Sequence, residues 1–320
     1  MRPVRAPRRP RPPELPPVTL RSIAKTAFLP VGKGYLPRQH LRRNVVALRG
    51  GANSLVLSFG WNRPNVEVEV LASGDCTDAD VERAFTAARR LTAVDDDPTE
   101  FVAIAKKHEV LRSLLDDVDP RLRMTETIFE AMAVAILEQL VTGFEARKAM
   151  WRLWYHAGEK VPGTDLLAVP TAEAVGKVPT WKLHEIGVGG RRAVTLINVA
   201  KRGASIEKLR AFPPEVFMEK IQSLPGIGQW TANYAARVGL GYSDAVPVGD
   251  FWAPYQIAEA FGRKVSRDDP KGADEAMIEV LEPFRPHRAR IAILLERFAM
   301  DNRTGPLPRV DPHRRYPWRY

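Results

Sequence analysis

The sequence contains one cysteine, Cys76, among 320 residues. A single thiol cannot form an intrachain disulfide framework, a four-cysteine iron–sulfur cluster or a cysteine-based zinc site. The six histidines are scattered, with no HExxH motif and no cluster of histidines and carboxylates at ligand spacing. These absences argue against a catalytic transition metal.

Long apolar runs are also missing. No stretch approaches the roughly 18 apolar residues of a membrane-spanning helix, and the N-terminal sequence "MRPVRAPRRPRPPELPP" is basic without the apolar segment of a secretory signal. The hydrophobic content of 45% is ordinary for a protein with a buried core, and 320 residues suffice for two or three domains. The sequence therefore predicts a globular cytoplasmic protein that does not span a membrane.

Acidic residues are in the minority. The chain has 48 Lys and Arg against 38 Asp and Glu, a formal net charge of +10. An excess of positive charge at this size indicates a polyanionic partner. Nucleic acid is the first candidate for that partner, and an anionic membrane surface is the second.

The N-terminal third divides into two segments. Residues 1–17 are mostly proline and arginine, which cannot bury enough apolar surface to fold, so they are predicted to form a disordered basic arm. That arm would be either a solubilising tail or a DNA contact. Residues 18–98 are predicted to form an antiparallel α+β domain, because alternating or β-branched stretches between Asn44 and Ser73 precede a helical pattern from Asp78 to Leu91.

Helical periodicity dominates residues 99–310. Apolar residues recur every three or four positions in stretches such as "TIFEAMAVAILEQLV" and "RARIAILLERFAM", whereas strand patterns nearly vanish. An all-helical core is therefore predicted, followed by a basic aromatic tail at residues 311–320. The predicted fold class is mainly α with an N-terminal α+β domain.

The stretch "LPGIGQWTANYAARVGL" (224–240) predicts a glycine hairpin between two helices. Leu224 and Ile227 would anchor it, while Gly226 and Gly228 permit positive φ and close approach of another backbone. A helix beginning near Gln229 would direct its unpaired amides and the positive end of its dipole outwards, which suits a phosphate. An ordinary tight turn between two helices is the alternative.

Together with "AVPVGD", which ends at Asp250, this stretch resembles the helix-hairpin-helix base-excision DNA glycosylases. Residues 129–142 and 187–203 are similar to the matching helices of the bacterial 3-methyladenine DNA glycosylase II subfamily, which also has a β-rich domain before its helices. The resemblance implies a helix-hairpin-helix glycosylase fold and a monomer that acts on double-stranded DNA in the nucleoid, with no membrane partner. It further implies base excision repair: a damaged base, an alkylated purine by preference, is flipped out and hydrolysed from its sugar.

The resemblance places Asp250 at the catalytic aspartate. Breaking an N-glycosidic bond builds positive charge on the sugar, which a fixed carboxylate stabilises. One acid suffices when the leaving base is already cationic, because an alkylated purine departs without protonation. As a residue preceding a helical pattern, Asp250 could also be an N-cap, and the two roles are compatible.

Trp230 and Tyr234 match aromatic pocket residues of the subfamily. They are four residues apart and share one helix face, so they could sandwich an extruded base. Packing in the core is the alternative. Members with lyase activity carry a nucleophilic lysine at the position of Trp230, so the resemblance implies a monofunctional enzyme.

The remaining site residues are also implied by the resemblance. Leu140 would be the wedge that fills the gap of the flipped nucleotide, with Gln139 as its polar companion in the minor groove; the alternative for Leu140 is a helix core position. No organic cofactor is expected, although hairpin carbonyls could bind a monovalent cation. The DNA-binding hairpin residues are Gly226, Ile227, Gly228 and Gln229, and the carbonyls belong to Gln222, Leu224 and Ile227.

Two residues depart from the family pattern. Gly249 stands where the family has an acidic or polar residue, and it is predicted to loosen the loop before Asp250. Glu296 stands where the subfamily commonly has a tryptophan against the base, unless the alignment slips to Phe298. In the pocket, Glu296 could hydrogen-bond an exocyclic amine or attract a cationic base. Alternative functions are a glycosylase for hypoxanthine or a bulky adduct, and a non-catalytic module that binds DNA damage.

Overall fold

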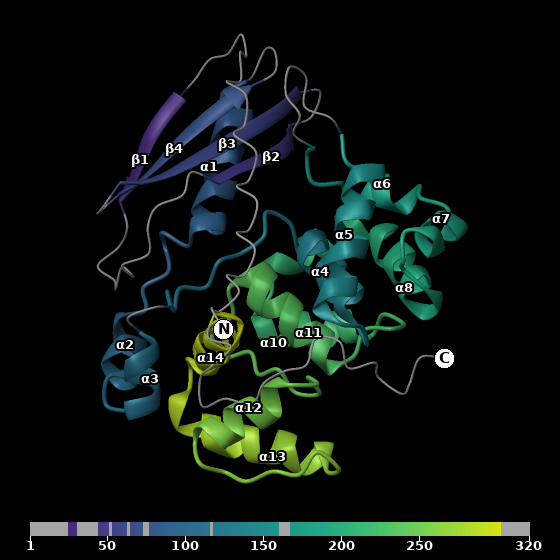
Figure 1. The fold of residues 1–320 in the computed structure, drawn as a ribbon. Helices are drawn as coiled ribbons and strands as arrows, with labels where there is room; N and C mark the ends of the chain where they lie inside the picture. The colour runs from purple at the N-terminus through teal and green to yellow at the C-terminus, as the bar shows by residue number, and fades with distance from the viewer. Residues whose placement is uncertain are drawn as a thin grey trace, which may run out of the picture.

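The computed structural model describes residues 25–30, 44–50, 53–62, 65–72, 77–115, 118–159 and 167–301, with side chains from residue 77 to residue 296 of these ranges. A small antiparallel sheet with one helix leads into a larger all-helical part (Figure 1). The mainly α fold class with an N-terminal α+β part is therefore confirmed. The predicted arm at 1–17, the predicted tail at 311–320 and Cys76 lie outside the described residues.

The sheet has four strands in the order β1-β4-β3-β2, with antiparallel neighbours throughout. Gly50 pairs with Asn53 and Asn62 with Asn65, so both hairpins are short. Helix α1 (Asp78–Thr92) packs against β3 and β4 (Figure 1). The strand bounds are Lys25–Pro30 (β1), Asn44–Gly50 (β2), Asn53–Asn62 (β3) and Asn65–Ala72 (β4).

The sequence patterns predict β2, β3 and β4, but they miss β1. This edge strand has the sequence KTAFLP, which is short and ends at a proline. Proline cannot donate to a sheet ladder and is tolerated only at such edges, so the segment carries little strand signal of its own. Pairing with β4, not local preference, defines it.

The rest of the described chain is helical, as the periodicity predicts. In chain order its helices are α2 (Thr99–Ala105), α3 (Glu109–Leu114), α4 (Ile128–Glu138), α5 (Gly143–Ala157), α6 (Ala172–Gly176), α7 (Thr180–Glu185), α8 (Gly190–Ala200), α9 (Gly203–Glu207), η1 (Lys208–Ala211), α10 (Pro214–Gln222), α11 (Gln229–Ala235), η2 (Ala236–Leu240), α12 (Ala253–Ala260), α13 (Pro270–Leu281), η3 (Glu282–Phe284) and α14 (Arg288–Asp301). The segment η2 continues α11 as a π-helix. None of the described helices combines the length and the apolar character that crossing a membrane would require.

Two hydrophobic clusters hold these helices. The first surrounds α4, which is apolar on almost every side and lies between α5, α8 and α11 (Figure 1). The second joins α2 and α3 to α12, α13 and α14. Each fully buried large side chain stabilises the fold by roughly 1.5–3 kcal/mol. Such side chains are Ile128, Met132, Ile136 and Ile221 in the first cluster and Phe101, Leu111, Met277 and Ile291 in the second.

Buried arginines of α14 tie the helical part together. Arg290 makes a two-pronged bond to the Asp96 carboxylate at 2.6 and 2.7 Å, which joins α14 to the segment between α1 and α2. Arg288 makes a second two-pronged bond, to Asp244, with both distances 2.7 Å. Asp244 lies in the segment between η2 and Asp250, so this pair fixes that segment against α14.

Candidate active site

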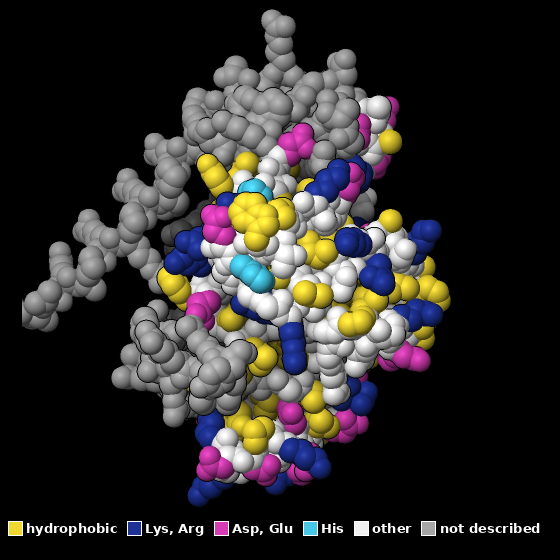
Figure 2. Space-filling model, turned by 90° about the vertical axis from the view of Figure 1, so that its right-hand side faces the viewer, with side chains coloured by type: hydrophobic (Ala, Val, Ile, Leu, Met, Phe, Trp, Pro, Cys, Tyr) yellow, Lys and Arg dark blue, Asp and Glu magenta, His cyan; other side chains and the backbone are white. Residues whose placement is uncertain are grey.

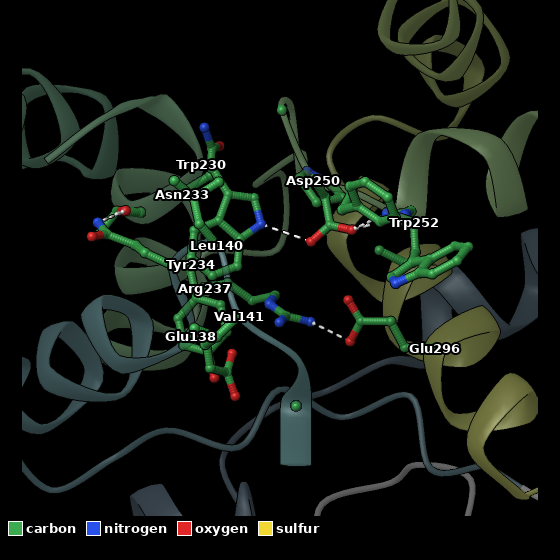
Figure 3. A pocket seen from close by; sticks show the side chains of 18 of the residues that line it. Glu138, Leu140, Val141, Trp230, Asn233, Tyr234, Arg237, Asp250, Trp252 and Glu296 are labelled. Atoms are coloured by element: carbon green, nitrogen blue, oxygen red, sulfur yellow. Dashed lines mark hydrogen bonds and ion pairs between the residues drawn. The ribbon is translucent and has the colours of Figure 1, made fainter. Parts of the chain in front are cut away.

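A cavity of about 670 Å³ lies between helices of the first cluster, α4, α5 and α11, and helices of the second, α12 and α14 (Figure 3). It is lined by the end of α4, the start of α5, the α11–η2 helix, the segment before α12, and α14. This volume lies within the range of ordinary small-molecule sites. The sequence-predicted residues Leu140, Trp230, Tyr234, Asp250 and Glu296 all line it.

The glycine hairpin connects α10 to α11 as predicted. Gly226 has φ +85°, and a Cβ added there would overlap the hydroxyl of Thr195 on α8, so this position requires glycine. Gly228 is different: its φ of −94° suits any residue, and a Cβ there would meet open space. The expectation that Gly228 supplies a positive φ is therefore wrong. Ile227 is buried in the first hydrophobic cluster, and Leu224 packs against it.

Asp250 is held by three N–H donors of the described chain. Its Oδ1 accepts the backbone amides of Trp252 and Ala253 at 2.7 and 2.8 Å, at the start of α12. Its Oδ2 accepts the indole Nε1–H of Trp230 at 2.8 Å (Figure 3). A carboxylate offers about four lone-pair sites, so these bonds fix its orientation and leave one site on Oδ2. The capping role and a position in the cavity thus coexist.

The turn before Asp250 is anchored, not loosened. Gly249 adopts φ +79°, a conformation that favours glycine, and its amide donates to the Asp274 carboxylate of α13 at 3.0 and 3.2 Å. The Asp250 amide donates to the carbonyl of Pro247 at 3.1 Å. Upstream, the Val246 amide donates to the side chain of Asn233 on α11. The expected loosening by Gly249 is therefore wrong, because the turn uses the glycine to reach Asp274.

The aromatic side chains form two walls of the cavity. Trp230 and Tyr234 contact each other, with ring centroids 5.5 Å apart and planes tilted by 43°. They line one wall together instead of sandwiching a space between them (Figure 3). Trp252 lies on the other side, and Arg267 stacks over its ring at 4.8 Å. The open space therefore lies between the Trp230–Tyr234 wall and Trp252, a residue that the sequence patterns did not indicate although it follows Asp250 by two positions.

Four side chains on three helices form a charged cluster in the cavity (Figure 3). Arg237 of η2 forms an ion pair with Glu296 of α14 at 3.2 Å, and its guanidinium lies 5.3 Å from the ring centre of Tyr234. Tyr234 lies near Glu138, the last residue of α4; burial and then the negative charge of Glu138 raise the pKa of the Tyr234 hydroxyl well above its usual value. Glu296 therefore faces the cavity, while the side chain of Phe298 lies outside the described residues.

Leu140 is not a core residue. It follows the end of α4, its side chain is 82% exposed, and its φ is +52°, an uncommon conformation for a residue other than glycine. Gln139 connects the turn at Leu140 to the hairpin. Its side-chain Nε2 donates to the Gly226 carbonyl at 3.0 Å and to the Thr231 hydroxyl at 2.9 Å. These two hydrogen bonds thus hold the turn at Leu140 against the hairpin.

The hairpin carbonyls remain a predicted cation site. The Leu224 carbonyl accepts the Ile227 amide at 3.1 Å, and a carbonyl oxygen has a second lone pair. Three neutral carbonyls, including those of Gln222 and Ile227, are a donor set compatible with a hard monovalent cation. Among the described residues, no group of three or more His, Cys, Asp or Glu side chains could hold a metal ion.

Sequence comparison gives a match to part of the chain. No protein-family model matches it. It is similar to DNA-3-methyladenine glycosylase 2 of Escherichia coli (strain K12), with 31% identity over 137 residues that cover 41% of this chain and 49% of the relative. The chain thus spans about half the length of that curated protein.

Structural comparison extends over most of the molecule. A 3-methyladenine DNA glycosylase from Archaeoglobus fulgidus matches with a TM-score of 0.66 at 20% identity, over 84% of this chain and 90% of that one. The 8-oxoguanine glycosylase/lyase of Clostridium acetobutylicum, in complex with double-stranded DNA, matches with a TM-score of 0.57 at 14% identity, over 80% and 88%. The chain therefore shares the helix-hairpin-helix fold of these DNA glycosylases.

Proposed function

We propose that the protein is a monofunctional DNA glycosylase that flips an alkylated purine out of double-stranded DNA and hydrolyses its glycosidic bond. The observation that carries this proposal is the Asp250 carboxylate, oriented by three donors in the wall of an aromatic-lined cavity in this fold. Trp230, not an amine, lies against that carboxylate, which favours hydrolysis by water over a covalent lyase intermediate. We further propose that it acts as a monomer in base excision repair in the cytoplasm.

The chemistry follows from the position of Asp250. As the bond between the sugar C1′ and the base nitrogen breaks, its electron pair leaves with the base and positive charge develops on the sugar. The carboxylate stabilises that charge in a cavity from which water is partly excluded. Water then adds to C1′ and gives up a proton to the open site of Oδ2. An already cationic base departs as a neutral molecule and needs no acid.

The surface around the cavity entrance suits duplex DNA. Helix α5 begins three residues after Leu140, and its exposed Phe144, Trp151 and Tyr155 share a face with Lys148. Aromatic and basic side chains together stack on bases and neutralise phosphates. Figure 2 shows the right-hand side of Figure 1, where α5 to α8 lie, with Lys and Arg side chains spread among hydrophobic ones. The hairpin amides of Gly226, Gly228 and Gln229 and a cation on the hairpin carbonyls would hold the phosphate backbone, whereas the Ile227 amide already donates to the Leu224 carbonyl.

Incubation with duplex oligonucleotides that carry single lesions tests the proposed function. We expect release of alkylated purine bases and an intact abasic strand, which only later alkali cleaves. Borohydride should trap no covalent complex with DNA, because no amine attacks C1′. If the protein binds lesions but releases no base from any of them, it is a damage-binding module; a trapped complex would contradict the monofunctional mechanism.

Truncation of the Leu140 side chain should affect the opening of DNA and leave folding unchanged. Because Leu140 is 82% exposed, Leu140→Ala should change the free energy of unfolding by less than about 0.5 kcal/mol. Unpairing and unstacking a base cost a few kcal/mol, so losing the wedge should slow excision about tenfold from a stable pair and less from a mismatch. Thermal melts and single-turnover excision measure both effects.

Val110→Ala on α3 is the matched control, since Val110 is an exposed apolar residue (39%) that does not line the cavity. It should leave excision unchanged. Equal slowing by Leu140→Ala on paired and mismatched lesions would contradict a wedge.

A further inference from the structure

Glu138 is a carboxyl group in the cavity that the proposed function does not use. It is the last residue of α4 and is partly buried in the cavity wall, across from Asp250 (Figure 3). Charged and titratable groups face it from every neighbouring element: Tyr234 and Arg237 from the α11–η2 helix, Glu296 from α14, Asp250 from the segment before α12, and Arg147 from α5.

The cavity holds more acidic groups than it can pair. Arg237 already forms its ion pair with Glu296, and Asp250 is satisfied by three N–H donors. Within the described part of the chain, Glu138 forms no ion pair of its own, although Tyr234 and Arg237 lie near it. An unpaired carboxylate ion in a low-dielectric site is costly, so such a group tends to keep its proton.

The electrostatics of Glu138 agree with this geometry. Burial, followed by repulsion from Glu296 and Asp250, raises its pKa to about 7, while Arg237 and Arg147 oppose the shift. A carboxyl group that titrates near neutral pH can hold a proton in the resting protein and give it up during a reaction. Its place in the cavity puts that proton within the space that an extruded base would occupy.

We propose that Glu138 is a general acid that protonates a departing base which carries no charge of its own. This inference rests on the proposed glycosylase function and widens its substrate class from cationic alkylated purines to neutral damaged purines, of which hypoxanthine is the simplest probe. Asp250 would stabilise the positive charge on the sugar in both cases, and Glu138 would protonate only the neutral base.

The step balances without any further reactant. The Glu138 carboxyl proton passes to a ring nitrogen of the base while the electron pair of the C1′–N bond moves onto the base. The base leaves as a neutral molecule, and C1′ takes the oxygen of water. The second proton of the reaction passes from that water to Asp250 and on to solvent, and Glu138 recovers its own proton from solvent after the base has left.

The proposal requires the two substrate classes to differ in pH dependence. Release of hypoxanthine needs the protonated form of Glu138, so its rate should be highest below pH 7 and should fall towards tenfold per pH unit above it. The rate of 3-methyladenine release should not fall as Glu138 loses its proton. The 3-methyladenine base is already cationic, and ionised Glu138 only adds negative charge beside it. Dividing the hypoxanthine rate by the 3-methyladenine rate cancels the pH dependence of any group that affects both reactions equally.

The experiment measures single-turnover rates for the full chain between pH 5.5 and pH 8. The probes are duplex DNA with one hypoxanthine and freshly methylated duplex DNA that contains 3-methyladenine. We expect the ratio of the hypoxanthine rate to the 3-methyladenine rate to fall through pH 7. Glu138→Gln should slow hypoxanthine release by about a hundredfold at pH 6, a loss typical of a missing general acid, and 3-methyladenine release by less than about threefold.

Glu130→Gln is the matched control. Burial and then repulsion by Glu126 raise the pKa of Glu130 to about 7 as well, but Glu130 lies about two turns back on α4 and does not line the cavity. It should leave the ratio unchanged. A change equal to that of Glu138→Gln would show an indirect effect through α4 and would overturn the proposal.

The remaining outcomes separate the two proposals. A wild-type ratio that is constant with pH, or equal slowing of both substrates by Glu138→Gln, would overturn the role of Glu138 and leave the glycosylase function intact. So would release of 3-methyladenine with no release of hypoxanthine at any pH. Release of neither base would overturn the proposed function itself. The wild-type ratio needs no substitution, so a variant that fails to fold does not remove the test.

Discussion

Asp250→Asn is expected to slow base release between about a hundredfold and a thousandfold, the loss typical of one preorganised group that stabilises transition-state charge. The asparagine oxygen can still accept the amides of Trp252 and Ala253, so α12 should remain in place. The uncharged side chain no longer stabilises a cationic sugar. Single-turnover excision measures the loss, and fluorescence anisotropy should show duplex affinity within about twofold of the parent protein, a difference well below 1 kcal/mol.

Trp230→Phe is the control for the hydrogen bond alone. It removes the indole donor to Asp250 but keeps the carboxylate charge and an aromatic wall. It should therefore slow excision far less than Asp250→Asn does. Base release by Asp250→Asn at the parental rate would instead assign the chemistry to another cavity carboxyl, Glu138 or Glu296.

Removal of the Asp244 carboxylate should produce the largest loss of stability. Asp244 is 5% exposed and accepts both prongs of buried Arg288 and a bond from Arg285. Breaking a buried pair from one side leaves an uncompensated charge, which costs about 3–5 kcal/mol. Asp244→Ala should therefore lower the Tm by roughly 10 °C, at about 2–4 °C per kcal/mol. Differential scanning calorimetry measures the shift.

A solvent-exposed pair of the same chemistry is the matched control. Arg263 and Glu279 form an ion pair in which both side chains are more than half exposed. Glu279→Ala should change the free energy of unfolding by at most about 1 kcal/mol. If both variants melt alike, the Asp244–Arg288 pair does not hold the segment before Asp250 against α14.

The sequence predicts most of the fold because its signals are local. Helical periodicity and the glycine hairpin specify α4, α8, α10 and α11 from neighbouring residues alone. Strand β1 is missed because only its partner β4 defines it. The behaviour of Gly249 is also missed, because its amide bonds Asp274, which lies 25 positions further along the chain.

The site residues likewise divide into those that lie in one local motif and those that only packing brings together. Asp250, Trp230 and Tyr234 lie within one continuous motif, so the sequence places them together. The charged cluster cannot be found in this way, since Glu138 and Arg237 look like ordinary polar positions on two helices. Only the packing of α4, η2 and α14 brings them to one cavity and makes Glu138 a partly buried acid.

The backbone at Leu140 limits which side chains evolution or a protein engineer can place at this tip. A φ of +52° is tolerated by glycine and asparagine and is least compatible with a branched Cβ. Leucine branches only at Cγ, so it combines reach with the least possible crowding at the backbone. Valine, isoleucine and threonine are therefore closed to this position however well their size would fill a gap in DNA. On this scaffold, position 140 is therefore restricted to side chains that are unbranched at Cβ. A wider choice would require a different backbone conformation in the turn that Gln139 joins to the hairpin by hydrogen bonds.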